Sequence, residues 1–283
     1  MSIQTVTSLD GRVKMLDGNT IPQFGLGVYE MDDEQTYQAC KWAFEAGYKH
    51  VDTAEWYENE GPSARAMLDY MEESDTPRSS LFFTSKLKTN RGYDETLRDL
   101  RNSLKVAGLE YFDLYLMHSA IGGPEMRKNV WRACVDAQKE GLVKSIGVSN
   151  FGVKHIQEFV DQGVPLPTVN QVDLHPFMRH PDIVEICQKH NILLEAWGPL
   201  ARAMRFDHAS VQKIAKAHGK DQAQIMLRWG LQHGTIIIPK SVSQKRIISN
   251  SQIFDFELSK DEMDELNGLD EYLVTDWDVV DCE

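Results

Sequence analysis

Short apolar strands alternate with helix-period segments along nearly the whole chain, and this alternation constrains the fold more than any other feature. Eight strands are predicted, at residues 24–27, 49–52, 81–85, 112–117, 144–148, 168–171, 193–196 and 235–238. Apolar residues between the strands recur at helical spacing, as at 34–46, 62–71, 95–106, 125–140, 181–190 and 222–232. Eight such units fit a closed parallel barrel or an open, doubly wound sheet.

The loop after the first strand favours the barrel. An open dinucleotide-binding sheet would carry a GxGxxG loop there, whereas residues 25–30 read Gly-Leu-Gly-Val-Tyr-Glu and lack the third glycine. No Gly/Ser linker or break in composition divides the chain. We therefore predict one domain over residues 1–283, an α/β fold of the (β/α)8 barrel type. A turn at Asp17-Gly18-Asn19, flanked by apolar residues, predicts a short β-hairpin before the barrel.

The charge balance and the cysteines limit the possible partners. A net charge of -13 argues against nucleic acid and anionic membranes, which require a broad basic surface. The four cysteines lie far apart, without the spacing of a metal site, so no metal is expected. The first residues lack the basic start and apolar run of a signal peptide, and no run of about 20 apolar residues could span a membrane. These features predict a cytoplasmic protein.

Ionisable residues stand where chemistry is expected in a barrel, at the carboxyl ends of the strands. Asp52 ends the second predicted strand, Tyr57 follows in the same loop, Lys86 follows the third strand and His118 the fourth. Taken singly, each has a structural alternative: a turn cap, a loop aromatic, a return of the chain to solvent, or a hydrogen-bonded core histidine. Because all four are expected at the same end of the barrel, we interpret them as parts of one catalytic site.

A phenol with a pKa of about 10 is a weak acid at neutral pH unless its phenolate is stabilised. We expect Lys86 beside Tyr57 to supply that stabilisation and Asp52 to keep the lysine charged and oriented. His118 can then donate a hydrogen bond to a substrate carbonyl oxygen. Together the four groups suit delivery of a proton to a carbonyl oxygen while a hydride arrives at carbon. The chain itself has no hydride donor, so a nicotinamide cofactor is required.

Three segments resemble those of the aldo-keto reductase family: 46–54 (AGYKHVDTA), 141–151 (GLVKSIGVSNF) and 238–242 (IPKSV). The resemblance extends from about residue 25 to about residue 269 and points to a short, microbial or fungal type of member. It implies NADPH-dependent reduction of aldehydes and ketones to alcohols. It also implies a catalytic tetrad, which falls on Asp52, Tyr57, Lys86 and His118.

The same resemblance implies the contacts of NADPH or NADP+. Residues matching the family's positions around the nicotinamide and the pyrophosphate are Gly27, Val28, Asp52, Ser149, Asn150, Gln171, Trp197, Gly198, Pro199 and Leu200. The adenosine end and its 2′-phosphate are expected at Lys240, Ser241, Arg246 and Asn250. Trp197 corresponds to the aromatic that stacks on the nicotinamide, with core filling as its structural alternative.

A small-molecule carbonyl substrate is expected against Tyr29, Trp56, Tyr57, Lys88, His118 and Ser119. Because Lys88 and Ser119 stand where many relatives carry tryptophan, the resemblance implies an open, polar mouth. The acidic segment 255–283 is expected to be a solvated helix and tail rather than a binding element.

Two other functions remain open on the sequence. One is a non-catalytic, cofactor-binding regulatory protein of the same fold, although such a protein has no need of a proton donor. The other is a Schiff-base lyase that uses Lys86 as its nucleophile. We expect a monomer, with a dimer as the alternative.

Overall fold

The computed structural model describes residues 5–283 and contains eight parallel strands in one sheet, ordered as they occur in the chain. The strands are β3 (Leu26–Gly27), β4 (His50–Asp52), β5 (Phe82–Leu87), β6 (Phe112–Met117), β7 (Val143–Ser149), β8 (Val169–Asp173), β9 (Leu193–Trp197) and β10 (Ile236–Ile237). The two edges of the sheet meet, because the Gly25 amide donates to the Ile237 carbonyl at 2.9 Å. A Cβ on Gly27 would lie 2.9 Å from the Ile238 carbonyl oxygen, so this closure requires a glycine. The predicted (β/α)8 barrel is confirmed.

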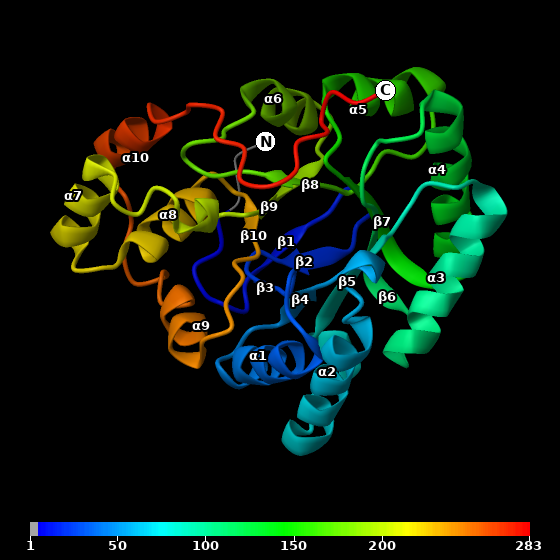
Figure 1. Cartoon of the computed structure of the whole chain (residues 1–283), viewed down its shortest axis with the longest axis horizontal. Helices are drawn as coiled ribbons and strands as arrows, with labels where there is room; N and C mark the ends of the chain where they lie inside the picture. Colours follow the sequence, from blue (N-terminus) through cyan, green and yellow to red (C-terminus); the bar gives the residue numbers. More distant parts are fainter. Residues whose placement is uncertain (1–4) are drawn as a thin grey trace.

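Helices surround the strands (Figure 1). They are α1 (Asp33–Glu45), α2 (Glu60–Ser74), α3 (Tyr93–Ala107), α4 (Pro124–Lys139), α5 (Val153–Gln162), α6 (Pro181–Lys189), α7 (Ala209–His218), α8 (Gln222–Gln232), α9 (Gln244–Asn250) and α10 (Lys260–Asn267). The start of α1 follows from its sequence, because Asp32 and Gln35 form a reciprocal capping box. None of the helices within residues 5–283 is both long and apolar enough to cross a membrane.

The predicted hairpin is present and closes one end of the barrel. Strands β1 (Arg12–Lys14) and β2 (Thr20–Pro22) pair in antiparallel register. Their buried side chains form a cluster with apolar residues of the barrel strands, three of which begin their strands. The cluster consists of Val13, Met15, Ile21, Phe82, Leu114, Leu116, Val169 and Ile236. Apolar packing therefore fills the end of the barrel that lies opposite the ionisable strand ends.

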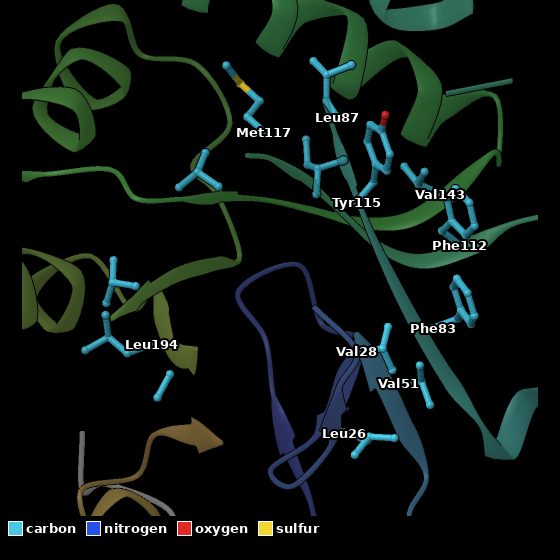
Figure 2. Packing of buried hydrophobic residues seen from close by; sticks show 14 of the residues in the cluster. Leu26, Val28, Val51, Phe83, Leu87, Phe112, Tyr115, Met117, Val143 and Leu194 are labelled. Carbon is cyan, nitrogen blue, oxygen red and sulfur yellow. The ribbon is translucent and has the colours of Figure 1, made fainter. Parts of the chain in front are cut away.

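Alternate residues of the strands point outward, under the helices. Figure 2 shows Phe83, Phe112 and Tyr115 side by side in this outer layer, where Phe112 stacks on the other two rings. The remaining residues of β4 and β5 point into the barrel, where His50 contacts Thr84 at 3.0 Å. In β5 the period of two places Phe83 outside and Thr84 and Lys86 inside, so the interior is polar toward the open end. In β6, Phe112 and Tyr115 are three residues apart and depart from strict alternation.

The C-terminal segment crosses the open end of the barrel instead of extending into solvent. In Figure 1 the red trace leaves α10, passes α6 and ends beside α5. Thr275 anchors the crossing through a 2.8 Å hydrogen bond from its hydroxyl to Asp173 at the end of β8. The end of the segment is held by Lys154, which donates to the Asp281 carbonyl at 2.7 Å. The interpretation of the whole segment 255–283 as a solvated tail is therefore wrong for its last part.

Candidate active site

A cavity of about 780 Å³ lies at the carboxyl ends of the strands and extends from the barrel centre toward α9. Most of its walls come from loops that follow strands, as expected for this fold. Seventeen of its lining residues were predicted as site residues from the sequence, thirteen as cofactor contacts and four as catalytic or substrate residues. The thirteen are Gly27, Asp52, Ser149, Asn150, Gln171, Trp197, Gly198, Pro199, Leu200, Lys240, Ser241, Arg246 and Asn250; the four are Tyr29, Trp56, Tyr57 and His118.

The four ionisable strand-end residues meet at one end of this cavity, where Asp52, Tyr57 and His118 line it and Lys86 lies behind them. Lys86 Nζ lies 2.5 Å from Asp52 Oδ1 and 3.4 Å from the Tyr57 hydroxyl. The same hydroxyl lies 3.4 Å from His118 Nε2. Lys86 also donates to the backbone carbonyl of Thr53 at 2.9 Å, which fixes its ammonium group behind the phenol. The convergence expected from the sequence is therefore present in the geometry.

Burial controls the protonation of these groups. It raises the pKa of Tyr57 to about 12, and the nearby Lys86 ammonium only partly opposes this shift. It also lowers the pKa of His118 well below its usual value, with Lys86 acting in the same direction. Burial opposes the charge of Lys86, yet Asp52 and Tyr57 raise the lysine's pKa overall. At neutral pH the phenol is therefore protonated, the imidazole is neutral and the lysine is charged.

A second group of polar residues lies beside the phenol, at the ends of β7 and β9. The Asn150 amide donates to the His118 carbonyl at 3.1 Å, and its oxygen accepts from Trp197 Nε1 at 2.9 Å. The indole of Trp197 is thereby held in one orientation at the cavity wall. Asn150 adopts a φ of 58°, a left-handed conformation that asparagine tolerates better than most residues. These contacts provide a flat aromatic surface next to amide and hydroxyl groups.

The loop after β9 turns sharply over the cavity. Gly198 has a φ of 63°, and a Cβ there would lie 2.7 Å from the Asp173 carboxylate. Residues 201–203 also have positive φ values, although none is glycine. Arg202 in this turn pairs with Asp276 at 2.8 Å and with Glu30 at 3.5 Å. The turn is therefore tied both to the loop after β3 and to the C-terminal segment.

The basic residues near α9 lie at the far end of the cavity. Lys240 and Arg246 are exposed, and Arg246 Nε donates to the Ser241 hydroxyl at 3.3 Å. Asn250, at the end of α9, is buried. Lys240 Nζ lies 4.0 Å from the Glu30 carboxylate, a loose contact between two half-exposed side chains. Two exposed cations at one end of the cavity suit an anionic group.

The substrate end of the cavity has an aromatic wall that sequence reasoning found only in part. Trp277, from the C-terminal segment, lies with its ring centroid 5.9 Å from that of Trp56 and 6.1 Å from that of His118. Tyr29 packs against Tyr57 on the other side, at 5.0 Å. Trp56 in this wall is half exposed.

Some of the predicted site residues lie elsewhere. Among residues 5–283, the lining of the cavity does not include Val28, Lys86, Lys88 or Ser119. Lys86 lies directly behind the phenol, whereas Lys88 points away toward Glu58. The backbone carbonyl of Ser119 accepts from Asn90 on the neighbouring loop. The lining residues missing from the prediction are Glu30, Arg202, Ala203, Phe206, Ala223, Ile238, Asp276 and Trp277. None of these residues carried a local sequence signal, since Trp277 shares its acidic segment with Phe256 and Tyr272.

Comparison with known proteins agrees with this geometry. The profile of the Aldo/keto reductase family matches residues 22–271. The chain is 40% identical to the glyoxal reductase of Bacillus subtilis, covering 93% of this chain and 94% of that protein. It is 39% identical to the methylglyoxal reductase of Escherichia coli, covering 92% and 93%. The structure of the Bombyx mori aldo-keto reductase in complex with NADP superposes with a TM-score of 0.89 at 31% identity, covering 94% of both chains. This oxidoreductase chain belongs to the aldo-keto reductase family.

Proposed function

We propose that this protein reduces small aldehydes or ketones to alcohols, using NADPH as the hydride donor and Tyr57 as the proton donor. One observation carries the proposal: the Tyr57 hydroxyl faces the cavity at 3.4 Å from both Lys86 Nζ and His118 Nε2. A protonated phenol that faces the cavity can donate, and the Lys86 ammonium stabilises the phenolate that remains.

The residues present fit a phosphorylated nicotinamide dinucleotide. Hydroxyl and amide groups lie beside Tyr57 at Ser149 and Gln171, and the Trp197 ring next to them offers a stacking surface. At the other end, Lys240 and Arg246 suit a phosphate, and Arg246 can bind it in a forked geometry. When bound, the cofactor would supply the hydride.

The protein's own part in the reaction is to orient groups and to move one proton. His118 is neutral, so its ring can donate a hydrogen bond to a carbonyl oxygen without giving up a proton. That bond orients the oxygen toward the phenol. Tyr57 then transfers its proton to this oxygen, and Lys86, held by Asp52, balances the charge left on the phenol. Trp56 and Trp277 limit the access of water to this end of the cavity.

The substrate class follows from the shape of this end and from the relatives. The aromatic wall of Tyr29, Trp56 and Trp277 leaves space for a compact molecule beside Tyr57. Relatives at about 40% identity are named for reduction of glyoxal and methylglyoxal. We therefore propose compact dicarbonyl compounds as good substrates.

The test is NADPH consumption at 340 nm with the purified protein and a panel of methylglyoxal, small aldehydes, 2-oxo esters and sugars. We expect turnover of methylglyoxal with formation of its alcohol. A protein that binds NADPH but consumes none with any member of the panel would contradict a reductase and favour a cofactor-binding regulatory role. Borohydride trapping of a substrate adduct on Lys86 would favour the lyase instead.

A further inference from the structure

One buried carboxyl group inside the barrel has no part in the proton transfer described above. Glu195 lies on β9, two residues before Trp197, and its side chain is fully buried. In the parallel pair β8 and β9 it stands directly beside Gln171. Since a buried carboxyl group is costly unless its oxygens find hydrogen-bond donors, its presence at this depth calls for a reason.

Glu195 shares one hydrogen-bond donor with the tetrad. Gln171 Nε2 donates to Glu195 Oε2 at 2.8 Å and to Asp52 Oδ2, also at 2.8 Å. A primary amide nitrogen has two hydrogens, and both are used by these two carboxyl groups. The remaining polar atom of the Gln171 side chain is its carbonyl oxygen, which can only accept.

The two carboxyl groups together determine which way the amide faces. If the Gln171 amide were flipped, its carbonyl oxygen would face an acceptor on each side. A flip would lose the hydrogen bond to Asp52, and it would also lose the one to Glu195 as long as Glu195 Oε2 carries no proton. Since Gln171 also lines the cavity, the orientation of its amide decides whether the cavity meets a donor or an acceptor at this point.

The protonation states inside the barrel allow Glu195 to accept from Gln171 without adding a second negative charge near Tyr57. The titratable groups around it are Asp52, Lys86 and His50, and His50 Nε2 lies 3.8 Å from Glu195 Oε1. Burial, and then the charges of Arg12 and Lys86, lower the pKa of His50 to about 3, so this imidazole is neutral. Burial and Asp52 raise the pKa of Glu195 to about 8. One ammonium therefore faces one carboxylate. Because Gln171 Nε2 donates to Glu195 Oε2, the proton of the neutral acid is carried by Oε1, on the side of His50, and Oε2 remains an acceptor.

We propose that Glu195 is a positioning residue that acts through Gln171: with Asp52 it fixes the Gln171 amide so that its carbonyl oxygen accepts from the carboxamide nitrogen of the nicotinamide. This inference rests on the proposed function, because it requires a nicotinamide cofactor. It assigns a role in cofactor binding to Glu195, a residue that contacts neither the cofactor nor the substrate.

A cofactor analogue tests this directly by binding alone. The 3-acetylpyridine analogue of NADP+ carries a methyl group in place of the carboxamide nitrogen, so it cannot donate to Gln171. We expect the wild-type protein to bind NADP+ about three- to tenfold more tightly than the analogue, the value of one hydrogen bond. Glu195→Met keeps the length of the side chain and removes the acceptor, and it should reduce this ratio to within about twofold of one. The readout is the quenching of tryptophan fluorescence on titration with each compound.

Three controls separate positioning from a general structural role. Glu195→Gln retains a carbonyl acceptor and should keep the wild-type ratio. Gln171→Met should lose the preference for NADP+ over the analogue, as Glu195→Met does. Adenosine 2′,5′-bisphosphate, which lacks the nicotinamide, should bind all variants within about twofold of wild type, because one hydrogen bond at the other end of the cavity is all that changes.

Several outcomes would overturn the inference: a wild-type ratio near one, an unchanged ratio in Glu195→Met, or equal loss of affinity for all three compounds. If Glu195→Met does not fold, Glu195→Ala removes the same acceptor without adding apolar bulk and is subject to the same criteria. If the wild type binds NADP+ with the expected ratio and Glu195→Met loses it, but no carbonyl compound is reduced, the proposed function would end while the role of Glu195 would be supported. Failure of the wild type to bind NADP+ would end both.

Discussion

The two ends of the cavity hold the same kinds of charge in opposite surroundings. At the tetrad end, the Asp52 and Lys86 side chains are 3% and 0% exposed, and they pair at 2.5 Å. At the α9 end, Lys240 is 39% exposed at the side chain, and its contact with Glu30 is 4.0 Å long. Buried charges are poorly screened and costly when unpaired, whereas exposed charges interact weakly until a ligand arrives. Substitutions at the two ends should therefore differ in size, in pH dependence and in salt dependence.

The largest effect on stability is expected from Lys86→Met. It leaves the Asp52 carboxylate buried without its partner, so the free energy of unfolding should fall by about 3 to 5 kcal/mol. Urea unfolding of the variant and the wild type measures the difference. Adding Asp52→Asn to the same protein removes the unpaired charge and should recover most of that loss, without restoring activity. A single variant as stable as the wild type would show that the tetrad end is more solvated than the structure indicates.

The next effect concerns pH at the buried end. Burial holds the pKa of Glu195 at about 8, above the value of 4.5 for an exposed glutamate. Between these values the native state holds a proton that the unfolded state has released, so this group's contribution to stability falls as pH rises. Compared with the wild type, Glu195→Gln should gain about 1.4 kcal/mol of unfolding free energy per pH unit in this window. Unfolding curves measured from pH 5 to 8 give the difference. Parallel pH profiles for the two proteins would contradict the shift.

At the exposed end, Arg246→Ala should change ligand binding and leave stability within about 0.5 kcal/mol of wild type. Loss of one exposed phosphate contact should weaken NADPH about tenfold at low salt and less at high salt. NADH lacks the 2′-phosphate, and its affinity should change by less than about twofold, since no charged partner is lost. Fluorescence titrations of both cofactors at two salt concentrations measure this. Equal weakening of NADH and NADPH would assign Arg246 a structural role.

The smallest effect is expected at the aromatic wall. Trp277→Ala removes a ring that packs against Trp56 and His118, contacts worth about 0.5 to 1.5 kcal/mol. The Michaelis constant for nitrobenzaldehyde should rise about three- to tenfold, and that for methylglyoxal less, because the smaller molecule covers less of the ring. Ser119→Trp serves as the control, because Ser119 lies outside the lining and its change should matter less. A larger effect of Ser119→Trp than of Trp277→Ala would place the substrate on the other side of the cavity.

Site residues whose positions follow from the order of the strands were predicted from the sequence. A site residue supplied by a distant segment of the chain was missed. Asp52 and Lys86 end neighbouring parallel strands, so their meeting follows from the order of the strands. Trp277 follows the last helix, and its place depends on long-range anchors such as the Thr275 hydrogen bond to Asp173. No local pattern encodes such an anchor.

The direction of a side chain just after a strand depends on the turn that follows, whereas within a strand it follows from the alternation of residues. Lys88 follows β5, yet its backbone amide donates to Glu55 and its side chain turns toward Glu58. The turn after the strand, and not the strand register, sets this direction. Glu195 lies within a strand, so its inward direction could have been read from its spacing to Trp197. An acidic residue on that inward face was a signal of a buried polar contact.

The most direct test of the central claim is a single turnover of the NADPH-bound protein with methylglyoxal, comparing the wild type with Tyr57→Phe by stopped-flow absorbance. The variant removes only the hydroxyl that lies 3.4 Å from Lys86 and His118. We predict a rate lower by about 10² to 10⁴, with NADPH affinity and unfolding free energy close to wild type. A variant that reduces methylglyoxal within about twofold of the wild-type rate would contradict proton donation by Tyr57, since loss of a general acid costs far more than that.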